Sequence, residues 1–295
     1  MSIRSAISIL LLIPAFAFAQ GDPLLEAYAK YQAGDLLDAK ALIEQAVATP
    51  EHKEDAEAWL LHGFIHKDLF KTMPAGAEAD SLRERAIGSL YRSIQLDKEG
   101  TYLENARQAY EYMARSYYND AAKALNDMDA ERAVELFAAY TRTVRKLDKG
   151  KEPVPREAEF KNALGTVYTK RFNHDRDRID QFDLAVEAYE RVLELDPGNY
   201  GANYNLATLY YNRGVYNIRS IKADDDIPSI QQIQEVSREF FQNALPYMLK
   251  AHDMKPGRRE TLIGLEGIYY SLQDQESADK FRKLFEELPS QEQDR

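Results

Sequence analysis

The sequence predicts an all-α protein built from repeated helix pairs, because two kinds of segment recur along it. Segments 160–172 (FKNALGTVYTKRF) and 202–214 (ANYNLATLYYNRG) align without gaps, and each places Leu, a small residue and an aromatic at i, i+1 and i+4, one stripe of a helix. Segments 182–199 and 241–258 also align, sharing an Ala, an aromatic or Met four residues later, and a closing Pro-Gly. No segment alternates convincingly enough to predict a strand.

Small residues in these stripes predict close crossing of the paired helices. On the first helix of a pair we expect Gly63, Gly165 and Ala207 to fill this role. The matching residues on the second helices are all alanines: Ala39, Ala86, Ala133, Ala185, Ala244 and Ala278. Pro197 and Pro256 are expected to end their helices, since proline cannot continue a helix and disfavours helix in the residue before it. Several tyrosines (Tyr168, Tyr189, Tyr210, Tyr269) also fall at core positions.

This pattern resembles the tetratricopeptide repeat (TPR), a helix–turn–helix unit of about 34 residues. The resemblance covers the chain from Asp22 to about Leu288 as five to six repeats. It implies a right-handed α-solenoid, because one pair cannot bury its own apolar face and must stack on its neighbours. Long hairpins and the ALPY segment around Pro246, which should bend its helix, are similar in style to exported TPR proteins of Bacteroidota-type bacteria.

Three repeats carry insertions between their two helices, at 70–82, 173–181 and 215–241. In the longest, apolar residues keep helical spacing on both sides of ADDDIPS. We therefore expect both helices to continue past the usual turn, with a flexible loop as the alternative. Asp224–Asp226 should be a solvated turn before a helix N-terminus, where negative charge is favoured, since calcium-loop spacing is absent.

The first residues predict export. Residues 1–19 combine one basic residue, Arg4, with an apolar run too short for a comfortable transmembrane helix and a small-x-small site ending at Ala19. We expect a signal peptide cleaved after Ala19, giving a periplasmic or secreted protein without an integral membrane segment; an uncleaved anchor is the alternative. The array should span 20–288, with a flexible tail at 289–295.

Composition narrows the classes of function. The chain has no cysteine and a net charge of −11, which argues against thiolate chemistry and against binding to nucleic acid or anionic lipid. His62 and His66 are four residues apart, but their segment, HGFIH, lacks the Glu of a zinc-protease helix and both fall at repeat core positions. We expect packed core histidines there rather than a metal site. Phosphate-loop and nucleophile-elbow motifs are absent, so no catalytic residue, cofactor or metal is predicted and the protein is not expected to be an enzyme.

The resemblance implies that first helices line a concave ligand-binding groove. The residues expected on it are Phe64, Lys67, Asn162, Thr166, Lys170, Tyr204, Thr208, Tyr211, Asn212 and Tyr270. Aromatic anchors among amides and hydroxyls suit a protein or peptide partner. Asn205 matches a position used by carboxylate-clamping TPR proteins, but the accompanying Lys and Arg pattern is missing. The sequence thus predicts a non-catalytic, protein- or peptide-binding scaffold or adaptor of the cell envelope. A carbohydrate- or cell-wall-binding solenoid is the alternative, and an empty solvated groove is a third reading.

Overall fold

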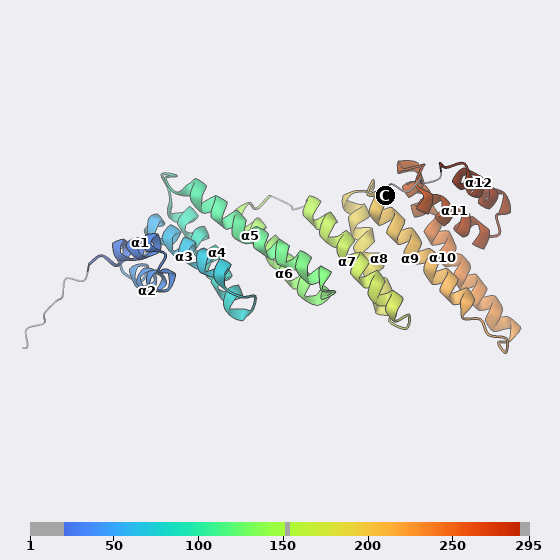
Figure 1. Cartoon of the computed structure of the whole chain (residues 1–295), viewed down its shortest axis with the longest axis horizontal. Helices are drawn as coiled ribbons and strands as arrows, with labels where there is room; N and C mark the ends of the chain where they lie inside the picture. Colours follow the sequence, from blue (N-terminus) through green and yellow to red (C-terminus); the bar gives the residue numbers. More distant parts are fainter. Residues whose placement is uncertain (1–20, 151–153, 290–295) are drawn as a thin grey trace, which may run out of the picture. The chain divides into compact units, whose positions relative to one another are not determined.

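A computed structural model describes residues 21–150 and 154–289. The predicted signal peptide, 1–19, lies outside the described residues, as do residues 290–295 of the predicted tail. The described part of the chain contains twelve α-helices and no strand (Figure 1). They are α1 (Pro23–Ala33), α2 (Leu36–Ala46), α3 (Ala56–Thr72), α4 (Ala77–Leu96), α5 (Leu103–Asn126), α6 (Ala130–Leu147), α7 (Val154–His174), α8 (Ile179–Leu195), α9 (Tyr200–Arg219), α10 (Ile227–Met254), α11 (Arg259–Ser271) and α12 (Gln275–Glu286).

The helices form two compact units, one ending at Ser116 and the other beginning at Tyr117, so that α5 contributes to both. In the first unit α1 packs on α2, α2 on α3 and α3 on α4. In the second, each helix from α7 to α11 packs on its successor, and the stacked rings of Phe137 and Phe160 join α6 to α7. Consecutive antiparallel pairs that bury their faces on the next pair define a TPR-like fold, and the predicted all-α solenoid class is confirmed. The predicted limits of the array, 20–288, stay a prediction.

The small residues lie where the sequence pattern places them. All six alanines predicted on the second helices are completely buried. A Cβ atom added to Gly63 would lie 2.6 Å from Cγ of Leu90, and one added to Gly165 would lie 2.7 Å from the ring of Tyr189. Both distances are below van der Waals contact. The helices of these pairs can therefore approach as closely as they do only because a glycine faces the partner.

Helix ends follow local chemistry. Six N-cap side chains accept a hydrogen bond from a backbone N–H of the first turn: Asp22, Asp55, Asp129, Asn199, Asp226 and Asp274. The helices before Pro197 and Pro256 end at Leu195 and Met254, as predicted. Two of these caps are also tied together, since His52 lies 3.0 Å from Oδ1 of Asp22 and 3.4 Å from Oδ2 of Asp55. His52 thereby links the starts of α1 and α3.

The longest insertion is a continuation of two helices. α9 extends to Arg219 and α10 begins at Ile227, which confirms the extended hairpin and leaves only a short connection. Asp226 caps α10, where its Oδ1 accepts a hydrogen bond of 2.8 Å from the Ser229 N–H, as expected for acids before a helix. Pro246 lies inside α10. The hairpin therefore projects ordered helical surface beyond the regular repeat.

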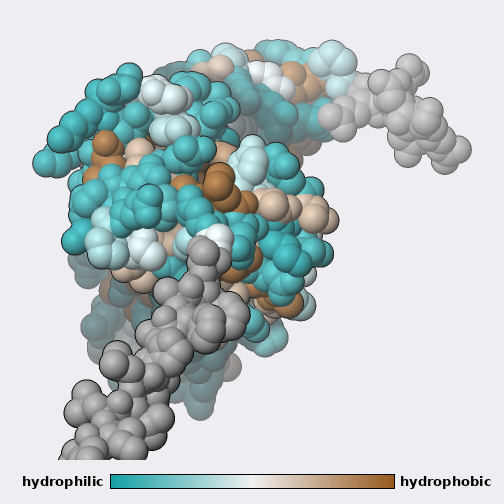
Figure 2. All heavy atoms as spheres, turned by 90° about the vertical axis from the view of Figure 1, so that its left-hand side faces the viewer, coloured by the Kyte–Doolittle hydropathy of each residue, from teal (hydrophilic) through white to brown (hydrophobic). Residues whose placement is uncertain are grey.

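Each unit has its own hydrophobic core. In the first, Ile43, Leu61 and Ile65 are central to a cluster from α1 to α4; in the second, Met248 and Leu265 are central to one from α9 to α12. Tyr168 and Tyr189 are buried as predicted, while Tyr210 and Tyr269 are partly buried. The outer face of the α1–α2 end is mostly hydrophilic, with small hydrophobic groups between (Figure 2). None of the described helices has the length and apolar character needed to span a bilayer.

Candidate functional site

Five of the ten residues predicted for the groove line a single pocket in the second unit. It has a volume of about 480 Å³ and lies between α9 and α11, the first helices of consecutive pairs. α9 contributes Tyr204, Thr208, Tyr211 and Asn212 along one face, and α11 contributes Tyr270 from the other side. Tyr270 is 64% exposed, and the four α9 residues are half-buried. We call this the tyrosine pocket.

Two glycines and a methionine also line the tyrosine pocket. Met248 of α10 is almost fully buried, and Gly264 and Gly267 belong to α11. A Cβ atom at Gly267 would lie only 2.6 Å from Oη of Tyr211, so a larger residue would displace that hydroxyl. The Tyr211 ring also packs on Phe241 with centroids 5.7 Å apart. The ring of Tyr211 is thus held in place where it lines the pocket.

Charged groups of both signs surround the pocket. Arg282 donates from Nε to Oε1 of Glu266 at 2.7 Å, and Glu260 accepts from Nε of Arg258 at 2.6 Å. The Arg258 guanidinium helps to hold the pKa of Glu260 below its usual value, against the opposing effect of burial. An aromatic cleft bordered by both charge signs suits a chain that offers apolar and polar groups in alternation.

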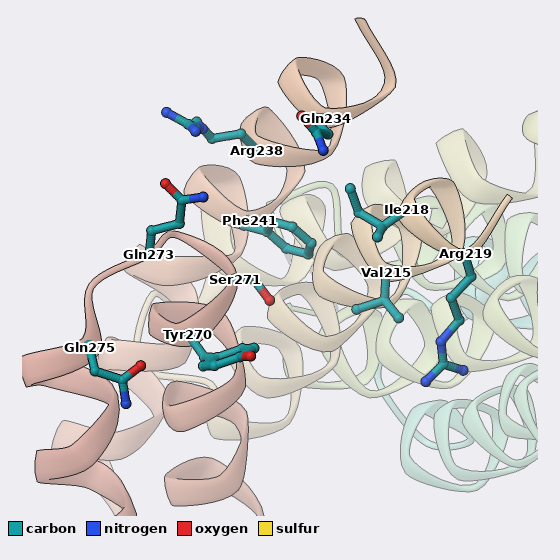
Figure 3. Close-up of a pocket in the computed structure, with 10 residues that line it drawn as sticks. All are labelled: Val215, Ile218, Arg219, Gln234, Arg238, Phe241, Tyr270, Ser271, Gln273 and Gln275. Carbon is teal, nitrogen blue, oxygen red and sulfur yellow. The ribbon is translucent and has the colours of Figure 1, made fainter. Parts of the chain in front are cut away.

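A second pocket of about 560 Å³ adjoins the tyrosine pocket, because Tyr270 lines both. Val215 and Ile218 of α9 face Phe241 of α10 across it, and polar residues of the α11–α12 turn close its other side (Figure 3). Ile218 is 38% exposed. We call this the hairpin pocket, since the extended parts of α9 and α10 form it.

The groove prediction did not include the hairpin pocket. Its apolar residues occur at helical spacing in the insertion, where they predict that both helices continue. The signal that could have found the pocket is an apolar row extending past the point where a neighbouring helix pair can cover it.

The other predicted groove residues are placed differently. On α7, the Thr166 hydroxyl donates to the carbonyl of Asn162 and lies 3.3 Å from Oη of Tyr189, while Lys170 is exposed. Burial raises the pKa of Tyr189, and the side chains of Thr166, Thr169 and Asn205 oppose this rise. Asn162, Thr166 and Lys170 line neither the tyrosine pocket nor the hairpin pocket. Their role in binding stays a prediction.

Phe64 and Lys67 lie on α3 in the first unit. The ammonium group of Lys67 is 4.8 Å from the centre of the Phe64 ring and 3.2 Å from Oδ1 of Asp68. Both side chains are partly buried. They contact each other, so a ligand would meet them as one amphipathic patch.

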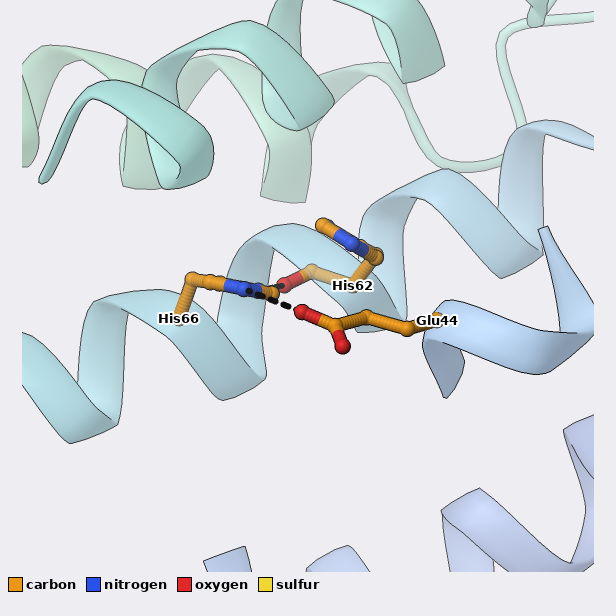
Figure 4. A group of neighbouring side chains, drawn as sticks. All are labelled: Glu44, His62 and His66. Atoms are coloured by element: carbon orange, nitrogen blue, oxygen red, sulfur yellow. Dashed lines mark hydrogen bonds and ion pairs between the residues drawn. The ribbon is translucent and has the colours of Figure 1, made fainter. Parts of the chain in front are cut away.

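His62 and His66 of α3 are core residues, as the sequence predicts. His62 is 7% exposed and His66 is completely buried. Glu44 of α2 lies beside them, with its Oε1 3.7 Å from Nε2 of His66 (Figure 4). Burial lowers the pKa of His62 to about 3, and it also lowers the pKa of His66. Both rings are therefore uncharged near neutral pH.

These features describe a TPR-like helical protein with a tyrosine-lined pocket between first helices. No protein-family model and no curated protein matches the sequence. Among solved structures, the chain is similar to YrrB, described as a TPR protein with an unusual peptide-binding site, with 16% identity, 85% of this chain and 93% of that chain covered, and a TM-score of 0.39.

It is also similar to PilW, described as a widely conserved type IV pilus biogenesis factor, with 16% identity and a TM-score of 0.36; the match covers 92% of this chain and 94% of PilW. The MamA protein gives 15% identity, 90% and 91% covered, and a TM-score of 0.28. Similarity at this level says nothing about function. The TPR-like fold of the chain rests on its own helix pairs and their buried small residues.

Proposed function

We propose that the protein is a non-catalytic scaffold that binds a protein or peptide segment through the tyrosine pocket. The observation that supports this most directly is the convergence of Tyr204, Thr208, Tyr211 and Asn212 with Tyr270 around one cleft. Tyrosines supply large contact area at low entropic cost, and the hydroxyl and amide groups between them can bond a backbone. The adjoining hairpin pocket offers apolar walls for a side chain further along the same segment.

A displayed random-peptide library, panned on the full-length protein, tests this proposal. Enriched peptides are synthesised, and their affinity is measured by fluorescence anisotropy. Tyr211→Ala and Tyr270→Ala should each weaken binding about tenfold or more, as expected for aromatic anchors. The matched control is Tyr28→Ala, which removes an exposed tyrosine from α1 in the first unit.

The result is interpretable only if the variants fold. We expect the Tyr211→Ala protein to lose no more than roughly 1–2 kcal/mol of stability, since its ring is half-buried. Equal affinity of all three variants for the enriched peptides would exclude the tyrosine pocket as the binding site. Binding on a glycan array with no peptide enriched would favour the carbohydrate-binding alternative.

We propose further that the protein works in the cell envelope after export. The support is the apolar run in residues 6–18 and the small-x-small site that ends at Ala19. N-terminal sequencing of the protein from its native host should begin at Gln20. An intact Met1 in the mature protein would contradict cleavage.

A further inference from the structure

Two buried imidazoles and one carboxylate converge between α2 and α3 in the first unit. One ligand atom from each of Glu44, His62 and His66 lies within 4.8 Å of the others (Figure 4). The His66 side chain is fully buried, whereas the Glu44 side chain is 39% exposed and gives the cluster a path to solvent.

The hydrogen bonds of His66 determine which of its nitrogens is free. Its Nδ1 lies 2.8 Å from the carbonyl oxygen of His62, and a carbonyl can only accept, so Nδ1 carries the proton. In the uncharged ring Nε2 then holds a lone pair. That buried nitrogen has no hydrogen-bond partner among the described residues, and it lies 3.7 Å from Oε1 of Glu44. Two electron-pair donors therefore face each other without a hydrogen bond between them, an arrangement that a bound cation would stabilise.

His62 is oriented in the same way. The Ser89 hydroxyl uses its one proton to donate to the carbonyl of Arg85 at 2.7 Å, so it accepts from Nδ1 of His62, also at 2.7 Å. Nε2 of His62 is then the unprotonated nitrogen. A second hydrogen bond that fixes the ring and its tautomer is typical of histidines that bind metals.

We propose that Glu44, His62 and His66 bind one divalent transition-metal ion, with Zn²⁺ as the preferred occupant, and that the ion joins the first helix pair to the second. Two imidazoles and one carboxylate are a donor set that Zn²⁺ takes readily, with a fourth position left for water. Ligands of tetrahedral zinc lie about 3.3 Å apart, from bond lengths of about 2.0–2.1 Å. The separation between Nε2 of His66 and Oε1 of Glu44, 3.7 Å, is already close to this value. The two imidazole rings are stacked, with centroids 4.2 Å apart and an angle of 21° between their planes, so one ring must turn toward the ion while the exposed Glu44 side chain rotates to complete the geometry.

Arg85 is the group that competes with the ion. Its Nη1 lies 2.9 Å from the same Oε1 of Glu44, and its side chain is 55% exposed. Nζ of Lys40 is 4.0 Å from that oxygen. Removing the positive charge of Arg85 should therefore tighten metal binding, because it frees the carboxylate and ends a like-charge repulsion. A purely structural role of the histidines gives no such effect.

The test uses the untagged full-length protein and Co²⁺ as a spectroscopic substitute for Zn²⁺. Trp59 is the only tryptophan, and its ring centroid is 5.5 Å from that of His62, so bound Co²⁺ should quench its fluorescence. We expect one Co²⁺ per chain, full displacement by Zn²⁺, and a visible spectrum of nitrogen and oxygen ligation, since the chain has no cysteine.

Three variants separate metal binding from general effects. Glu44→Gln should weaken Co²⁺ binding at least about tenfold. Glu54→Gln, which breaks a comparable ion pair with Arg92, should leave it unchanged. Arg85→Met should tighten it severalfold. The Glu44 side chain is 39% exposed, so Glu44→Gln should leave the protein folded. Absence of one-to-one binding with quenching, or equal affinities of the two Glu→Gln variants, would overturn the proposal.

Discussion

Gly165→Ala should destabilise the protein although alanine is the better helix former. The added Cβ would lie 2.7, 2.8 and 3.0 Å from three ring carbons of Tyr189, each closer than van der Waals contact. Tyr189 is only 1% exposed, and its hydroxyl lies 3.3 and 3.4 Å from the hydroxyls of Thr166 and Thr169. The ring therefore cannot move aside without losing packing and both polar contacts.

The size of the effect follows from three contributions. Overpacking of a dense core costs about 1–3 kcal/mol. Weakening the hydrogen bonds of a buried hydroxyl costs about 1 kcal/mol more. Alanine returns about 1 kcal/mol through its helix propensity. The net loss should be about 2 kcal/mol in the free energy of unfolding.

Urea unfolding followed by circular dichroism at 222 nm measures this loss. Gly88→Ala is the matched control, because Gly88 is also helical but an added Cβ there meets no atom within 4 Å; this variant should gain about 0.5–1 kcal/mol. Tyr189→Leu replaces the ring that Gly165 faces with a smaller side chain, so the double variant should lose less stability on Gly165→Ala than the wild type does. If Gly165→Ala stabilised the protein as Gly88→Ala does, close helix approach would not be the reason for this glycine.

Three further outcomes are expected. Burial lowers the pKa of His52, but the N-cap carboxylates of α1 and α3 raise it by more, to above 6.5. The stability that His52 gives the folded protein should therefore be full below about pH 6.5 and be lost as pH rises through the folded-state pKa. The difference in unfolding free energy between the wild type and His52→Gln should shrink over that range. Gly34→Ala should cost about 1 kcal/mol in urea unfolding, since Gly34 has φ +82° and nothing near its Cβ position; no loss would show that the turn relaxes. The metal-free His62→Leu/His66→Tyr protein, with the residue types usual at these repeat positions, should melt at a higher temperature than the wild type; a lower melting temperature would make the histidines structural.

The fold could be predicted because its determinants are local and repeated. The Ala and Gly positions, the Pro-Gly helix ends and the i, i+4 aromatic spacing each depend on residues within one helix pair. The extended α9–α10 hairpin was predictable for the same reason, since apolar spacing continued through residues 215–241. The predicted row on α9 likewise lies on one face, because its spacing is that of a single helix.

The sites depend on contacts between pairs, and these could not be predicted from spacing alone. Glu44 joins His62 and His66 only because α2 packs on α3 in one particular register. The hairpin pocket similarly requires the end of α9 to pass the α11–α12 turn. A one-residue change in either packing register would bring a different helix face into the contact, while the sequence pattern would be unchanged.

The cost of the histidine pair is the strongest reason to regard it as more than packing. The repeat tolerates apolar residues at these positions, as Leu164 and Tyr168 demonstrate in the fourth pair. A buried ring nitrogen without a hydrogen-bond partner costs about 1–3 kcal/mol relative to a satisfied one. A protein that is held by packing alone, without disulfides, has little stability to spare. An ion that occupies the cluster would satisfy both Nε2 lone pairs and the facing carboxylate at once, and would turn this local cost into a cross-link between α2 and α3.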